Sequence, residues 1–172
     1  MPKSLTFIYT RYYFQKVMKK MKHSEKRFLF WQQWLFYSSL LFAGFGIVLA
    51  LFGKSQIFSP YNKMLAETFW SKEVFPDGTA EFRNFILGPL GGTIACCYVL
   101  VAFIAHFPFR KKERWARNAI IVAFLFWFIL DSGVALFYGV YFHVLVINMF
   151  SLVIKALPLI FTWRHFNTKK SR

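Results

Sequence analysis

The feature that most constrains this chain is a set of long runs without a charged side chain. Residues 28–53 and residues 84–109 each form a run of 26 residues that lacks Asp, Glu, Lys and Arg. A helix needs about 20 apolar residues to cross a hydrocarbon core about 30 Å thick, so each run is long enough to cross a membrane once. The two runs predict a first span at about residues 34–53 and a second at about residues 85–108.

A third run extends from residue 118 to residue 163 and contains only two charged residues, Asp131 and Lys155. As one helix these 46 residues would be about 69 Å long at about 1.5 Å per residue, which is too long for one crossing and suits two. The break is expected within residues 138–141, where a glycine lets the chain turn and tyrosines suit the membrane interface. This run therefore predicts a tight helical hairpin with spans at about residues 118–138 and 141–163.

The composition excludes the other broad classes of protein. The chain has 172 residues, of which 57% are hydrophobic, 22% aromatic and only 17% charged. Soluble domains carry about 25% charged residues, and disordered chains are poor in aromatic residues. The net charge of +15 alone would suit a nucleic-acid binder, but such proteins do not normally contain long uncharged runs. We predict an all-α membrane protein with one four-helix transmembrane domain over residues 34–163, and no nucleic-acid partner.

The basic residues predict the orientation of the spans. Residues 1–33 hold 8 Lys and Arg, residues 54–84 hold 4, residues 110–117 hold 5 and residues 164–172 hold 4. With four spans, 17 of these residues (8, 5 and 4) share one side of the membrane. The positive-inside rule places that side in the cytoplasm. We therefore expect both termini and the inner loop, 109–117, to be cytoplasmic, 54–84 to be an outer loop, and 164–172 to be a basic tail. This arrangement predicts a multi-pass protein of the cell membrane.

Two interpretations of the first 33 residues stay open. Phe14, Val17, Met18 and Met21 recur at helical spacing among lysines, which is typical of a basic amphipathic helix lying on an anionic inner leaflet. Alternatively, Met21 begins a compact start just before the first span, and residues 1–20 are an over-extended start. Neither interpretation changes the predicted topology.

The outer loop is expected to contain a short interfacial helix. Ser59 followed by Pro60 has the form of a helix N-cap and a first helical position, and Tyr61 begins an apolar face. The turn residues of Phe75-Pro76-Asp77-Gly78 (75–78) end this segment before the chain enters the second span.

Asp131 is the leading candidate for a functional residue. A carboxylate inside a span is costly, so it normally faces protein or water and indicates a functional site. Trp127 and Tyr138 lie four residues before it and seven after it, on the same helical face. The alternative is a structural role, in which Asp131 supplies hydrogen bonds that hold the hairpin together.

The fourth span carries a polar stripe. Tyr141, Asn148, Ser151 and Lys155 fall within an arc of about 80° at 100° per residue. In a hairpin turning at residues 139–140, Asn148 lies level with Asp131, and Lys155 lies about 10 Å deeper. We hypothesise a polar ladder of Asp131, Asn148, Ser151 and Lys155 between the last two spans.

Lys155 has two further interpretations. Its ammonium group can snorkel along its own stem to the cytoplasmic headgroups. Alternatively, Pro158 frees the carbonyl of Ile154, because proline has no N–H to donate and its ring clashes with that carbonyl. The freed carbonyl would then be a partner for the ammonium group.

Small residues form a smooth face on the second span. Gly88, Gly92 and Cys96 repeat every four residues, with Gly91 beside them, and this spacing lets helices approach closely. The face is predicted to pack against another span of the same subunit, with homo-oligomer contact as the alternative. Cys96 and its neighbour Cys97 point about 100° apart on a helix, which suits neither a disulfide nor joint metal binding.

No motif indicates an enzyme, a metal site or a cofactor. The four histidines have no metal-ligand spacing, and the chain lacks the glycine-rich phosphate loops and the nucleophile motifs of known enzymes. His143, near the outer surface, is the one histidine that could act with Asp131 in handling protons. We therefore expect no cofactor and no metal, and the enzymatic interpretation is the least supported.

Three segments resemble small bacterial four-span integral membrane proteins of uncharacterised function. They are ILGPLGGTIACCY (86–98), HFPFRKKERWARNAI (106–120) and WFILDSGVALFYGVYFHVLVIN (127–148). The resemblance covers about residues 28–163, implies a location in the cell inner membrane of a bacterium and brings no established activity with it. It implies that the residues to test first are Gly91, Gly92, Pro108, Trp115, Trp127, Asp131 and Asn148.

Three functions are compatible with these features. The first is a non-catalytic membrane module that binds an apolar or amphipathic small molecule, a lipid or a partner helix through its aromatic surfaces. The second is a proton- or ion-coupled carrier in which Asp131 titrates and Lys155 is its charge partner. The third is an intramembrane lipid-modifying enzyme with Asp131 and His143 as acid and base. A pocket that opens sideways to lipid would favour the first function.

Overall fold

The computed structural model describes residues 3–166, apart from the side chains of residues 3–18 and 20, and this part of the chain is helical without a strand. The helices follow one another as α1, η1, α2, α3, η2, α4, η3, α5 and η4. Their bounds are Lys3–Phe52, Gln56–Phe58, Ser59–Trp70, Thr79–Ile104, Ala105–Phe109, Arg114–Phe137, His143–Asn148, Met149–Thr162 and Trp163–Phe166.

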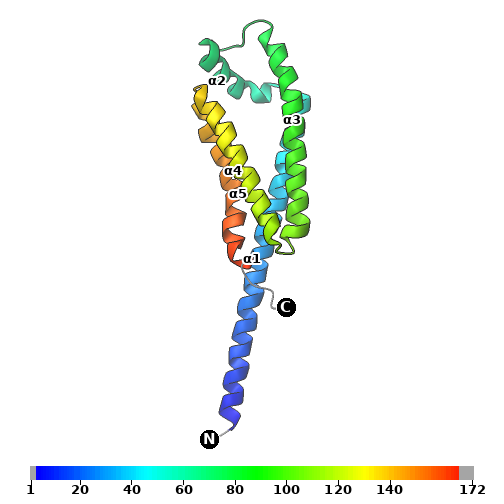
Figure 1. Ribbon diagram of the computed structural model, residues 1–172, viewed down its shortest axis with the longest axis vertical. Helices are drawn as coiled ribbons and strands as arrows, with labels where there is room; N and C mark the ends of the chain where they lie inside the picture. The colour runs from blue at the N-terminus through cyan, green and yellow to red at the C-terminus, as the bar shows by residue number, and fades with distance from the viewer. Residues whose placement is uncertain (1–2, 167–172) are drawn as a thin grey trace.

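Four helical segments are long and apolar enough to cross a membrane, as the uncharged runs predict. They are Met21–Phe52, Thr79–Phe109, Arg114–Phe137 and His143–Phe166, and each contains an 18-residue stretch with a mean hydropathy between 2.0 and 2.4. α1 and α3 lie side by side, and α4 and α5 form the other half of the bundle (Figure 1). Three of the four segments begin several residues before the predicted spans, at Met21, Thr79 and Arg114, because helical hydrogen bonding continues past the apolar core. The other ends lie within three residues of the predicted bounds, which is close to the usual uncertainty of helix ends.

The first helix extends well beyond the other three. α1 runs without interruption from Lys3 to Phe52, and its N-terminal part projects past the end of the bundle (Figure 1). The backbone of residues 3–20 is helical, but the apolar face predicted at Phe14, Val17 and Met18 lies outside the described side chains. The expectation that this segment lies on the leaflet stays a prediction.

The contact between α1 and α3 depends on glycines at two positions. A Cβ atom on Gly46 would lie 2.6 Å from the nitrogen of Ala95, and one on Gly91 would lie 2.5 Å from the nitrogen of Ala50. No side chain fits at such distances, so the two backbones touch. A Cβ atom added to Gly88 or Gly92 would meet nothing within 4 Å, and Cys96 is exposed. The close packing within the subunit therefore uses Gly91, one helical position away from the Gly88, Gly92 and Cys96 stripe.

The hairpin between α4 and α5 turns at the predicted glycine. Gly139 has a φ of 73°, a left-handed conformation that a side chain would strain. Its N–H donates to the carbonyl of Leu136 (3.1 Å), and the N–H of Val140 donates to the carbonyl of Ala135 (2.8 Å). This pair of bonds is the Schellman motif, which satisfies the last carbonyls of α4. The turn sets α5 back along α4.

The end of the bundle opposite this turn is closed by aromatic rings. Phe28 stacks on Phe109 with ring centroids 6.0 Å apart, and Phe109 meets Phe166 edge-on at 4.8 Å. All three rings are buried in the same apolar cluster. We call this the basic end, because the α3–α4 loop and η4 bring five exposed or half-buried cations there: Arg110, Lys111, Lys112, Arg114 and Arg164.

The segment α2 covers the other end of the bundle, beside the hairpin turn (Figure 1). Its first residue is Ser59 and Phe58 is its N-cap, so Ser59 lies inside the helix and Pro60 occupies the first turn. The helix ends at Trp70, and its C-cap Ser71 has a left-handed φ of 53°, so α2 stops before the predicted turn at 75–78. The capping side chain of this loop is Ser55, which accepts the N–H of Ile57 in η1.

Candidate functional site

A network of hydrogen-bonded polar side chains lies at the end of the bundle that holds the α4–α5 turn, which we call the turn end. The imidazole of His143 joins two partners, with Nδ1 2.9 Å from the Tyr61 hydroxyl and Nε2 2.9 Å from the Asp131 carboxylate. Asn148 donates through Nδ2 to the same Asp131 oxygen at 2.6 Å and to the Ser132 hydroxyl at 3.0 Å. The site therefore contains a continuous hydrogen-bonded path from α2, through η3, to α4.

A π-helical turn explains why two residues of η3 reach one carboxylate. His143 and Asn148 are five residues apart, which in a regular α-helix would place them about 140° apart around the axis. η3 is a π-helix, whose hydrogen bonds run from residue i to residue i+5, so residues at this spacing come onto one side. Both side chains can then bind Asp131. Such turns occur frequently at functional sites.

Tyr61 belongs to this hydrogen-bonded network, but the sequence pattern did not assign it to a site. The sequence pattern places it on the apolar face of the interfacial helix, and its ring does contact Phe142 and His143. The pKa of Tyr61 is raised to about 12, mainly by burial and also by the negative charge of Asp131, while Arg83 opposes the shift. The only signal in the sequence was a hydroxyl on an otherwise apolar face.

Lys155 lies apart from Asp131, although both are on the hairpin. Its side chain is 1% exposed, Nζ donates to the Ser38 hydroxyl at 3.1 Å, and Nζ lies 4.4 Å from the ring centroid of Phe42. Its neighbour on the stripe, Ser151, bonds the hydroxyl of Tyr98 at 3.0 Å. Within residues 3–166 no ion pair joins Asp131 and Lys155.

The predicted ladder is therefore divided between two neighbours. Asn148 bonds across the hairpin to α4, whereas Ser151 and Lys155 bond to α3 and α1. The division arises because α5 packs against α1 as well as α4, so the part of the stripe further from the turn faces α1. The sequence predicts that these residues share one face of the helix, but it does not show which helices contact that face.

Pro158 frees a backbone acceptor as predicted, but a different donor occupies it. The indole Nε1 of Trp34 donates to the carbonyl of Ile154 at 3.2 Å, whereas the Lys155 ammonium group bonds to Ser38. Pro158 lies within α5 and is buried. The carbonyl that Pro158 leaves without a backbone donor in α5 is thus hydrogen-bonded by a tryptophan of α1.

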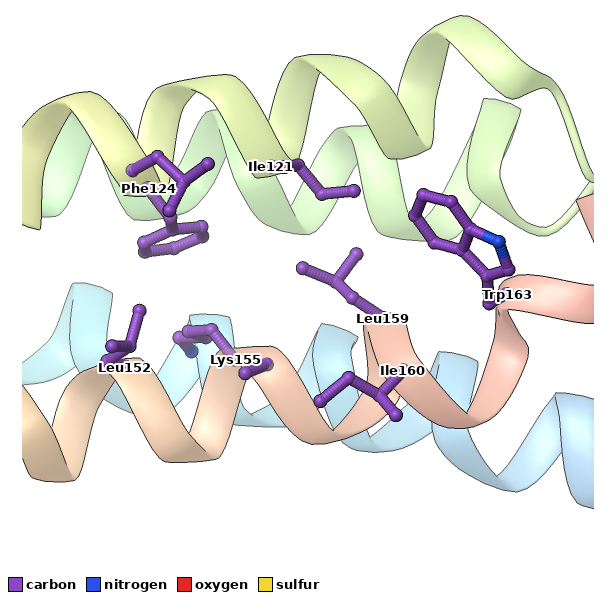
Figure 2. A pocket seen from close by; sticks show the side chains of 9 residues that line it. Ile121, Phe124, Leu152, Lys155, Leu159, Ile160 and Trp163 are labelled. Carbon is purple, nitrogen blue, oxygen red and sulfur yellow. The ribbon is translucent and has the colours of Figure 1, made fainter.

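A cavity of about 180 Å³ lies between α4 and α5. Figure 2 shows Ile121 and Phe124 entering it from α4, opposite Leu152 and Leu159 of α5, with Trp163 at the end toward the basic end. Lys155 lines the cavity, while its Nζ bonds to Ser38 of α1. The remaining lining residues are apolar as well: Leu125, Ala156 and Ile160.

The other predicted residues lie around these two features. Trp127 packs partly buried against the apolar cluster, and the ring of Tyr138 lies 5.9 Å from the ring of Phe69 on α2. Tyr141 is 61% exposed at the turn. Within the described residues no group of three or more His, Cys, Asp or Glu residues is arranged to hold a metal ion.

Comparison with known proteins brings no relative to this chain. No protein-family model, curated protein sequence or solved structure matches it. The resemblance to small bacterial four-span membrane proteins stays a prediction, so the function must be inferred from the residues of this chain alone. Its four long apolar helices indicate an integral membrane protein that crosses the bilayer several times.

Proposed function

We propose that this protein is a non-catalytic membrane module that binds an apolar or amphipathic molecule in the cavity between α4 and α5. The observation that supports this proposal is the cavity itself, which has a volume of about 180 Å³ and walls of Ile, Leu, Phe, Ala and Trp side chains with the stem of Lys155. An apolar cavity excludes water and favours hydrocarbon. Its contents would be held by dispersion and by the hydrophobic effect.

The volume indicates the kind of occupant. Pockets for drug-sized ligands measure about 300–1,000 Å³, which is larger than this cavity. A volume of about 180 Å³ instead suits a segment of one hydrocarbon chain. We infer that the ligand inserts a single chain, with the rest of the molecule outside the cavity.

The rim of the cavity supports entry from the bilayer. Leu125, Ile160 and Trp163 line it and are 50%, 65% and 45% exposed, whereas Phe124 and Leu159 at its floor are buried. All three rim residues belong to the spanning segments Arg114–Phe137 and His143–Phe166. The cavity would therefore open sideways toward lipid rather than toward either aqueous phase.

Native mass spectrometry of the delipidated full chain, titrated with the single-chain lipid lysophosphatidylcholine, tests this function. Ala156→Leu places three further carbon atoms in the cavity and should abolish the bound-lipid peak. Val153→Leu is the matched control, because Val153 is half exposed on the same helix and does not line the cavity. Failure of the wild-type protein to retain lipid, or equal retention by Ala156→Leu, contradicts the proposed function.

A proton- or ion-coupled carrier is the second candidate. The hydrogen-bonded path from Tyr61 through His143 to Asp131 favours it. Hydrogen-bonded carboxylate and imidazole groups inside a membrane are typical of proton relays. Lys155 would act separately in such a carrier, since it bonds to Ser38. Asp131→Asn in proteoliposomes should abolish proton or ion flux, with Asp77→Asn in the outer loop as the control. Unchanged flux in Asp131→Asn excludes the carrier.

A further inference from the structure

The cavity between α4 and α5 lies beside a buried arginine, Arg117, that has no carboxylate partner in the described part of the chain. Arg117 lies one helical turn before Ile121, which lines the cavity, and the Arg117 guanidinium group stacks 4.0 Å from the ring centroid of Trp163. Trp163 therefore belongs both to the cavity wall and to the surroundings of Arg117. The hydrocarbon-lined space and the cation adjoin each other at the basic end.

The hydrogen bonds of Arg117 are incomplete. The side chain is only 6% exposed, and its Nε and Nη2 both donate to the same Asn118 oxygen, at 3.1 and 2.9 Å. Its Nη1 is buried and has no hydrogen-bond partner among the residues that the structure describes. No ion pair of Arg117 exists within residues 3–166. A buried charged group with free donors is costly, and an anion would satisfy both its charge and those donors.

We propose that the cavity takes the acyl chain of an anionic lipid whose phosphate binds the guanidinium group of Arg117. This inference rests on the proposed function and names the chemical class of its ligand. A guanidinium group presents paired N–H donors that match phosphate oxygens, which makes arginine the preferred residue for such recognition.

The position of Arg117 fits a lipid from the leaflet at the basic end. Arg117 lies in the first turn of α4, where the helix enters the apolar part of the bundle, and Leu125, the last α4 residue of the cavity wall, lies eight residues further along the helix. At about 1.5 Å per residue, this places the charge about 12 Å from the far end of the wall. A headgroup at Arg117 with its chain pointing into the cavity follows the direction of lipid in that leaflet.

The experiment titrates the delipidated full chain with lysophosphatidylglycerol and with a monoacylglycerol of equal chain length, which has no phosphate, and measures both dissociation constants by native mass spectrometry. A hydrogen-bonded charge pair should make the wild type prefer the anionic lipid about tenfold. Arg117→Gln should remove this preference and leave the binding of the monoacylglycerol within about twofold of wild type. Arg164→Gln is the matched control, since it removes an exposed cation at the same end.

The outcomes separate this inference from the proposed function. Equal affinity of the wild type for the two lipids, a preference retained by Arg117→Gln, or an equal loss in Arg164→Gln overturns the role of Arg117, and the cavity remains a chain-binding site. Failure to bind either lipid overturns both proposals. If Arg117→Gln does not fold, Arg117→Lys decides: it keeps the charge without the planar pair of donors, so a severalfold lower preference supports the inference and an unchanged preference overturns it.

Discussion

Gly91 and Gly92 are adjacent in the chain, yet a methyl group would meet different surroundings at each. At Gly91 a Cβ would lie 2.5 Å from backbone atoms of α1, and at Gly92 it would meet nothing within 4 Å. Backbone atoms of a packed helix cannot rotate away, so the two helices would have to separate. The residue type alone does not distinguish the two positions.

We predict that Gly91→Ala lowers the free energy of unfolding in detergent by about 1–3 kcal/mol, because it forces the α1–α3 contact apart. Gly92→Ala should leave it unchanged or raise it, since alanine favours helix by about 1 kcal/mol. Denaturant or thermal unfolding followed by circular dichroism measures both. Equal stability of the two variants would contradict the close packing of α1 on α3 through Gly91.

At the scale of elements, a hydrogen bond joins α1 to α5: the indole of Trp34 on α1 donates to the backbone carbonyl of Ile154 on α5. Pro158 cannot donate to the carbonyl of Ile154, and Trp34 donates to it instead. The proline leaves a carbonyl of its own helix without a donor, and the packing of the helices determines which side chain donates to it. The sequence indicated the free carbonyl, but the choice of Trp34 over Lys155 required the rotation of α1 about its axis.

A double-mutant cycle tests this bond. Trp34→Phe should destabilise the wild type by about 1 kcal/mol beyond its loss of ring area, because the Ile154 carbonyl loses its donor. In the Pro158→Ala background the backbone N–H of residue 158 becomes available to the Ile154 carbonyl. Trp34→Phe should therefore lower the free energy of unfolding less in this background. Unfolding free energies of the four proteins give a coupling energy, expected at about 0.5–1.5 kcal/mol. A coupling energy of zero would show that the indole bond does not stabilise the protein.

The attachment of α2 to the hairpin should depend on pH through Tyr61. The pKa of Tyr61 is raised from 10.0 to about 12 in the folded protein, so the folded state holds the phenol proton more tightly than the unfolded state. The stability that this provides is complete below about pH 10 and is lost as pH rises from about 10 to about 12. Tyr61→Phe should lose less stability than the wild type in this window.

The measurement for Tyr61 is the thermal midpoint of both proteins from about pH 8 to about pH 12, taken as the difference between wild type and Tyr61→Phe, because the other tyrosines titrate in both. The difference should be constant below about pH 10 and shrink above it. A difference that does not change with pH would contradict the burial of the Tyr61 hydroxyl beside Asp131.

At the scale of the whole molecule, the basic end and the turn end should lie on opposite sides of the membrane. The bundle places the α3–α4 loop and η4 at one end, and α2 with the hairpin turn at the other (Figure 1). The distribution of 17 basic residues against 4, counted by segment, predicts that the basic end faces the cytoplasm. This orientation is a prediction from charge, since helix packing is the same in either direction.

Cysteine accessibility in intact cells tests the orientation. In a background with Cys96→Ser and Cys97→Ser, Asp77→Cys should react with a membrane-impermeant thiol reagent, while Lys111→Cys should react only after the cells are permeabilised. Both positions are exposed or partly exposed. The reverse pattern of labelling would invert the topology and would assign Arg117 to the outer leaflet.

The sequence by itself determined the number and class of the elements in this protein. The uncharged runs predict four apolar helices, and Gly139 between two interfacial tyrosines predicts the turn. Both follow from local properties, because the cost of placing charges in hydrocarbon and the conformational freedom of glycine act residue by residue. The structure contains these four helices and this turn.

Only the tertiary structure decided which side chains meet. The rotation of each helix about its axis selects Gly91 over Gly92, gives Trp34 to Ile154, and sends Lys155 to Ser38. The π-helical turn at η3 changes the periodicity that places His143 and Asn148 on Asp131. Contacts between distant segments depend on packing summed over whole helices, and a periodicity read along one chain does not contain that sum.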